Sequence, residues 1–137
     1  QAGQARFGEQ KLMNCLGTYA LVAIARGDNA FSKYLNDDFV IPDTTLAEFY
    51  WVLLRDFDER TASEWIGKLS AYSRQAEKSV LLEAIRFRHL HKKQDVSFFD
   101  AVGYAFARRN NCKFVTGDKE FRGMPGVDFI TSSITRR

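Results

Sequence analysis

The sequence predicts a single α/β domain in which a central, mostly parallel sheet is flanked by helices in a three-layer sandwich. Short apolar runs typical of buried strands recur along the chain, and longer stretches with helical periodicity separate them. These stretches are too long for hairpins, so they imply right-handed crossovers between parallel strands. The chain has 137 residues, 45% of them hydrophobic, which suits one domain with a substantial core.

Strands are expected where a short apolar run is bounded by turn or cap residues. The first run, LMNCL, precedes a glycine, and the second is broken by Pro42. A third precedes the Gly117-Asp118 turn. The predicted strands are residues 12–16, 39–41, 113–116 and 127–130.

Helices are expected where apolar residues recur at a spacing of three or four. Gly27 closes the first helix, and the third begins directly after Pro42 and Asp43. In the fifth helix, Leu81, Leu82 and Ile85 are predicted to form the apolar face. The predicted helices are residues 18–26, 28–35, 44–55, 59–72, 75–92 and 97–109.

Charge, cysteine spacing and the length of apolar stretches indicate the kind of partner and the cellular compartment. Twenty Lys and Arg against 17 Asp and Glu give a net charge of +3, a mild bias that suits a polyanionic partner. Cys15 and Cys112 lie in apolar runs without C-x-x-C spacing, which predicts a reduced cytoplasmic protein, with a disulfide between them as the alternative. No apolar stretch approaches the roughly 18 residues that a membrane span requires, so no membrane partner is expected.

The polar residues 1–11 lack strand or helix periodicity, while Met13 stands directly before the first strand. We expect residues 1–11 to be a leader added to the native start, with a native extension as the alternative. Residues 12–137 are expected to form one domain, because no linker, repeat or low-complexity tract divides them.

Three carboxylates recur at one architectural position. Glu48, Asp100 and Asp118 each lie just beyond a strand or in the first turn of a helix, at the carboxyl edge where open α/β sheets bind ligands. Unit charges about 5 Å apart repel by roughly 3 kcal/mol at an effective dielectric of about 20, so such a cluster requires a cation. Oxygen ligands without Cys or His favour Mg²⁺ or Mn²⁺, the arrangement used in phosphodiester hydrolysis.

Each acid also has an ordinary explanation. Glu48 follows Thr45, and Asp100 follows Ser97, at the spacing of a capping box. Asp118 fits a turn residue whose side chain bonds its own backbone. Taken singly, the two helical acids are better explained by capping, but capping does not require the three to converge.

Other polar residues are weaker candidates. His89 and His91 are two apart on a helix and point away from each other, so they are interpreted as part of a solvated basic helix end. Six basic residues are candidates for RNA phosphate contacts, although a run of charges is more often a solvated surface. They are Arg86, Arg88, Lys92, Lys93, Arg108 and Arg109.

Four segments in order and spacing resemble PIN-domain ribonucleases of the VapC toxin type. They are LGTYAL at residues 16–21, TLAE at 45–48, FDA at 99–101 and VTGDKEF at 115–121. The resemblance covers residues 12–130 and implies a PIN-like fold and a Mg²⁺- or Mn²⁺-dependent endoribonuclease. It also implies a homodimer and a VapB-like protein antitoxin whose tail reaches the acidic residues.

Carried over position by position, the resemblance makes Glu48, Asp100 and Asp118 metal ligands and catalytic residues. It assigns supporting roles to Thr18, Thr116 and Glu120.

The first acid of the family, an Asp at the end of strand one, falls on Gly17. Glycine has no side chain to hold a cation, so activity of this chain is expected to be severely reduced. An inactivating Asp-to-Gly change and natural degeneration both explain the glycine. A non-catalytic PIN-like module that binds RNA or an antitoxin is the alternative function, and a phospho-acceptor receiver domain fits the contexts of Asp37, Asp38 and Asp43 poorly.

Overall fold

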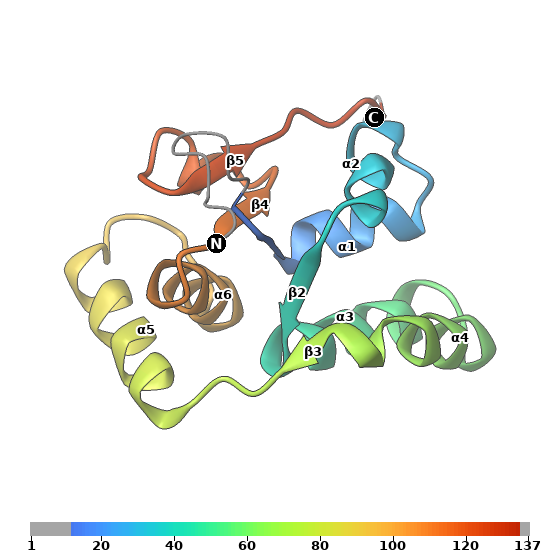
Figure 1. Ribbon diagram of the computed structural model, residues 1–137, viewed down its shortest axis with the longest axis horizontal. Coiled ribbons are helices and arrows are strands. Elements are labelled where there is room, and N and C mark those ends of the chain that lie inside the picture. Colours follow the sequence, from blue (N-terminus) through green and yellow to red (C-terminus); the bar gives the residue numbers. More distant parts are fainter. Residues whose placement is uncertain (1–11, 135–137) are drawn as a thin grey trace, which may run out of the picture.

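A computed structural model describes residues 12–134, and within them the strands form one parallel sheet (Figure 1). The order across the sheet is β3-β2-β1-β4-β5, and every neighbouring pair is parallel. The strands are β1 (Asn14–Leu16), β2 (Phe39–Pro42), β3 (Ser73–Arg74), β4 (Lys113–Thr116) and β5 (Val127–Phe129). The segment assigned to a leader, residues 1–11, lies outside the described residues.

Helices cover both faces of the sheet, which confirms the predicted three-layer α/β sandwich. Figure 1 shows α5 and α6 on one side and α1 to α4 on the other. The helices are α1 (Thr18–Ala25), α2 (Asn29–Ser32), α3 (Asp43–Asp56), α4 (Glu59–Leu69), α5 (Lys78–Leu90) and α6 (Phe98–Arg109). Within residues 12–134, none of these helices has the length and apolar character needed to cross a membrane.

The element boundaries differ from the sequence prediction in two places. The helix predicted over residues 59–72 ends at Leu69 and continues as a 3₁₀ turn, Ser70–Tyr72. The two-residue strand β3 then pairs with the end of β2, with Ser73 opposite Ile41. The sequence missed β3 because an exposed edge strand of this length carries no apolar alternation.

Two apolar cores form because successive strand residues point to opposite faces of the sheet. Cys15 and its register partner Phe114 face α5 and α6, and all of these belong to one cluster. Leu16 and its partner Val115 face α1 to α4 and belong to the other. The central strands β1 and β4 are therefore buried on both faces, as parallel strands in such sandwiches are.

The apolar face predicted for α5 was right for Leu81, which packs against the core, and wrong for Leu82 and Ile85. Its fully buried residues are Val80 and Ala84, whereas Leu82 is 64% exposed and Ile85 is 50% exposed. The helix packs on α6 through Val80, Ala84 and the partly buried Phe87, whose ring lies 5.3 Å from that of Tyr104. Hydrophobicity alone did not reveal which of two apolar stripes would face the core.

Both cysteines are buried and free, so the disulfide alternative is absent from the structure. Burial raises the pKa of Cys15 well above its ordinary value, and the nearby Cys112 adds to the effect. Burial likewise raises the pKa of Cys112. Both thiols are therefore held in the unreactive protonated form.

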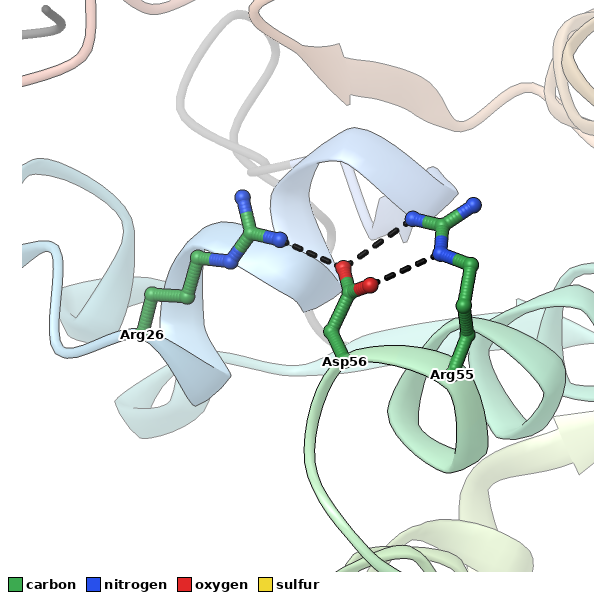
Figure 2. Close-up of polar contacts among 3 residues, drawn as sticks. All are labelled: Arg26, Arg55 and Asp56. Atoms are coloured by element: carbon green, nitrogen blue, oxygen red, sulfur yellow. Dashed lines mark hydrogen bonds and ion pairs between the residues drawn. The ribbon is translucent and has the colours of Figure 1, made fainter.

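An ion-pair group joins the ends of α1 and α3 (Figure 2). Asp56 accepts from Arg26 Nη2 at 2.7 Å and from Arg55 Nε at 2.7 Å. Hydrogen bonds from Arg55, with the charge of Arg26, lower the pKa of Asp56. The contact fixes α1 against α3, the two helices that carry Thr18 and Glu48.

Asp28 anchors the end of the described chain to the start of α2. Its carboxylate is 1% exposed, caps α2 through the Ala30 amide at 3.0 Å, and accepts bonds from Ser132 Oγ and from Ser133. Burial raises the pKa of Asp28, but the hydrogen bonds from Ser132, Ser133 and Ala30 outweigh it and hold the pKa below its ordinary value.

We expect Asp28→Ala to lower the free energy of unfolding by about 2 kcal/mol, because it removes a helix cap and the buried carboxylate that accepts the hydrogen bonds of Ser132 and Ser133. Asp58→Ala is the matched control: Asp58 also caps a helix, through the Thr61 amide, but it is exposed. That change should cost only about 1 kcal/mol. Urea denaturation measures both, and equal losses would contradict the anchoring role of Asp28.

Candidate functional site

The sheet has its topological switch point between β1 and β4. From central β1 the chain adds β2 and β3 on one side, and then returns to add β4 and β5 on the other. Gly17 follows β1 and hydrogen bonds through its amide to Val115 O at 3.2 Å. The connections after β1 and β4 therefore begin side by side, at the place where folds of this class bind ligands.

Glu48 is not part of a capping box. The helix α3 begins at Asp43 with Pro42 at the N-cap position, so Thr45 lies inside the helix and is 1% exposed. The Glu48 carboxylate instead accepts a hydrogen bond of 2.6 Å from the hydroxyl of Thr18, the first residue of α1. The capping explanation for this acid was wrong, because the helix starts three residues earlier than the pattern requires.

Asp100 lies in the first turn of α6, where Ser97 Oγ accepts from its amide at 3.1 Å. Of the two hydrogen bonds in the expected capping box, the one from the Asp100 amide to the Ser97 side chain is thus present. The pKa of the Asp100 carboxyl is raised to about 7, first by burial and then by the negative charges of Glu48 and Asp118. A hydrogen bond with the Asp118 carboxyl also raises it, while one with Ser97 lowers it.

Asp118 is a turn residue, as its ordinary explanation predicts. Its Oδ1 accepts from the Glu120 amide at 3.0 Å and caps a 3₁₀ turn, Lys119–Phe121. Its own amide donates to Thr116 Oγ1 at 3.1 Å, and Thr116 is 1% exposed. Thr116 therefore fixes the backbone of Asp118, so the turn role and a contact with Asp100 coexist in one residue.

Glu48, Asp100 and Asp118, named here the acidic cluster, thus come from α3, α6 and the turn after β4 and meet around Asp100. Within residues 12–134, no three or more His, Cys, Asp or Glu side chains already surround one point as metal ligands do. Two of the three acids are turned towards protein donors, Thr18 and the Glu120 amide. An oxygen-only donor set with mutually repelling charges is nevertheless the chemistry that suits Mg²⁺ or Mn²⁺.

Two residues near the acidic cluster escaped the sequence analysis as site residues. Ser97 bonds Asp100 and was interpreted only as a cap. Thr44 lies one helical turn before Glu48, and within the described residues its hydroxyl is buried without a hydrogen-bond partner. The four-residue spacing between Thr44 and Glu48 is the sequence signal that places both on one helix face.

Glu120 is turned away from the acidic cluster. Its Oε1 accepts from the Asp95 amide at 3.3 Å, and its carbonyl accepts from Gln94 Nε2 at 3.1 Å. Both partners belong to the connection between α5 and α6. Glu120 therefore ties that connection to the turn that carries Asp118.

The candidate RNA-contacting residues divide into two groups. Arg109 Nη1 donates to Ser79 Oγ, so the end of α6 lies beside the start of α5 and the two helices are antiparallel. Lys92 and Lys93 are exposed in the connection that leads to Asp100. Arg108, in contrast, lies eight residues beyond Asp100, about 12 Å farther along α6.

His91 and Arg88 make contacts within the end of α5 and the connection from α5 to α6. The Nδ1 atom of His91 lies 2.9 Å from Phe87 O, and Arg88 Nε donates to Val96 O at 2.9 Å. Neither histidine belongs to a group of side chains that could hold a metal within the described part of the chain.

Solved structures of toxin–antitoxin proteins share the fold. A DNA-bound VapBC complex from Salmonella typhimurium matches with a TM-score of 0.69 and 18% identity over 87% of this chain and 97% of that one. VapC20 of Mycobacterium tuberculosis, a toxin that cleaves the sarcin–ricin loop, matches with 0.67 and 20% over 82% and 97%. A toxin–antitoxin complex from Klebsiella pneumoniae matches with 0.67 and 18% over 84% and 95%.

Comparison with curated proteins gives no match. The PIN domain family, in contrast, matches residues 15–127, which include the last two residues of β1, the acidic cluster and the first residue of β5. The match covers most of the chain, and the resemblance seen in the four sequence segments is confirmed. This protein belongs to the PIN domain family.

Proposed function

We propose that this protein is a toxin-type endoribonuclease that hydrolyses RNA phosphodiesters with Mg²⁺ or Mn²⁺. The observation that carries the proposal is the raised pKa of Asp100, caused by burial and by the charges of Glu48 and Asp118. Such mutual repulsion is unfavourable for folding alone, and a divalent cation would relieve it. Membership of the PIN domain family supports the same reading.

In this proposal, Glu48, Asp100 and Asp118 hold the ion. When bound, it lowers the pKa of a water molecule and neutralises charge on the phosphate. Thr18 orients Glu48 through its 2.6 Å hydrogen bond, and Thr116 holds the Asp118 backbone in place. These fixed side chains would keep the ligand oxygens close to their working positions.

Gly17 weakens the proposed site. Its backbone follows β1 at the switch point, so a carboxylate there would be a fourth ligand, and glycine supplies none. We expect metal affinity and cleavage to be low in this chain. The same residue favours the second candidate function, a non-catalytic module that binds RNA or an antitoxin.

Partners follow from the same relatives. The matched Salmonella and Klebsiella structures are toxin–antitoxin complexes, so we propose a VapB-like antitoxin for this chain. We also propose a homodimer, and the exposed Leu82 and Ile85 on α5 provide apolar surface for association. Light scattering of the purified chain, alone and with a candidate antitoxin, measures both assemblies.

We further propose that Lys92 and Lys93 hold RNA phosphates beside the acidic cluster. Glu120 links their connection to the Asp118 turn, where Lys119 and Arg122 are also exposed. Arg108 and Arg109 lie towards the other end of α6 and are excluded from this role.

Glu48→Gln should weaken Mn²⁺ binding at least about 10-fold, because it removes a charged ligand, and a ligand loss should exceed the 10- to 100-fold effect of residues behind the ligands. Glu83→Gln is the control, since Glu83 is exposed on α5 and makes no hydrogen bond within the described residues. Isothermal titration calorimetry and RNA cleavage with Mn²⁺ are the measurements. Equal Mn²⁺ affinity in the two variants would remove the proposed site, and saturable Mn²⁺ binding without cleavage would favour the non-catalytic module.

Replacing Lys92 and Lys93 with Gln should weaken binding to single-stranded RNA and reduce the slope of log affinity against log salt by about 1. Replacing Arg108 and Arg109 with Gln removes the same charge from the other end of α6 and should change neither. Fluorescence anisotropy in the presence of a chelator measures binding without cleavage. Equal losses in the two double variants would show that only net charge matters.

The pH dependence of stability tests the environment of Asp100. In the folded protein the Asp100 carboxyl has a pKa of about 7 and keeps its proton below that pH. An Asp in the unfolded chain loses its proton near pH 4. The free energy of unfolding should therefore fall as pH rises from about 4 to about 7, by up to about 1.4 kcal/mol per pH unit. Asp100→Asn should flatten this slope in chelator-treated protein, as urea denaturation will measure, and parallel profiles would contradict the assignment.

A further inference from the structure

Gly17 is not required by its backbone conformation. Its φ of −82° and ψ of 172° are extended values that any residue adopts. A side chain is nevertheless excluded by its neighbours. A Cβ at this position would lie 2.9 Å from Phe114 Cζ, 3.0 Å from Phe114 Cε1 and 3.4 Å from the Val115 carbonyl oxygen.

A second glycine, Gly103, lies against the same two atoms of that ring. A Cβ on Gly103, in the middle of α6, would lie 2.9 Å from Phe114 Cε1 and 3.4 Å from its Cζ. The tip of the Phe114 ring is thus wedged between the residue after β1 and the helix that carries Asp100. Neither glycine has room for a methyl group while the ring stays there.

The Phe114 ring has little freedom to move aside. It is fully buried, and its centroid lies 5.2 Å from that of Phe121 and 5.9 Å from that of Tyr104, both in edge-on contact. Interiors packed this closely resist displacement, because moving one ring displaces its neighbours as well. The contacts at Gly17 and Gly103 are therefore not those of a flexible side-chain end.

We propose that Gly17, Phe114 and Gly103 form one packing unit, named here the Phe114 wedge, in which the aromatic ring fills the space that the first acid would occupy. The chain is thus adapted to glycine at residue 17, and a carboxylate fits there only when residue 114 is smaller. The local site then consists of Glu48, Asp100 and Asp118 alone. A single Gly17→Asp change does not rebuild a four-acid site in this protein.

The sign of a stability change tests the wedge. At an extended backbone position without a clash, Gly→Ala stabilises a protein by restricting its unfolded state. The wedge predicts the opposite for Gly17→Ala, a fall in Tm of several degrees. Gly67→Ala is the matched control, because Gly67 lies inside α4 with nothing within 4 Å of its Cβ position, and Tm should rise.

A double-mutant cycle identifies Phe114 as the cause. Phe114→Leu removes the ring tip and will itself lower Tm, so it serves as the second background. Gly17→Ala should lower Tm less in that background than in the natural chain, or should raise it. A rise in Tm for Gly17→Ala with Phe114 present, or the same change in both backgrounds, would overturn the proposal.

The last experiment, which measures metal binding, rests on the proposed function. Calorimetry with Mn²⁺ on the full chain compares Gly17→Asp with Gly17→Asp combined with Phe114→Leu. We expect affinity to rise at least 10-fold in the double variant and little in the single one. Equal gains in both would overturn the wedge. Coupled Tm values without Mn²⁺ binding in any variant would uphold the wedge and reject the metal site, so the two failures are distinct.

Discussion

Mutual repulsion among partly buried carboxylates is the constraint around which this end of the molecule is organised. Asp100 loses water on burial and faces Glu48 and Asp118, so it keeps its proton to about neutral pH. Hydrophobic packing alone gives no reason to bring these charges together, and the arrangement is unfavourable unless a cation or a proton joins it. Groups whose pKa is shifted by burial and by neighbouring charges are common at functional sites, which is why this cluster carries the proposed chemistry.

The sheet makes this concentration of charge possible. Strands β1 and β4 are buried on both faces and pair in register, which supplies the stability that the acids reduce. A hydrogen bond with a neighbouring hydroxyl group then holds each acid, or its backbone, in position. Thr18 holds Glu48, Ser97 bonds Asp100, and Thr116 fixes the turn that presents Asp118.

The Phe114 wedge and the acidic cluster share one helix, because α6 carries both Gly103 and Asp100. The strand residues that face α6 include Cys15 and Phe114, and Gly17 continues that alternation at the switch point. In the proposed arrangement, the ring of Phe114 fills the space of an oxygen ligand at residue 17. On that proposal, the loss of the first acid changes the core as well as the site.

Local patterns in the sequence determined the order of the elements other than β3 and the parallel sheet, and they indicated the three candidate acids, because apolar periodicity and turn residues act over a few positions. They did not determine which face of α5 is buried, where α3 begins, or that Glu120 bonds Asp95, because each depends on contacts between distant segments. Only the tertiary structure brought Gly103 and Gly17 against Phe114. Steric fit between residues far apart in the chain is a property of the packed molecule, which no single segment encodes.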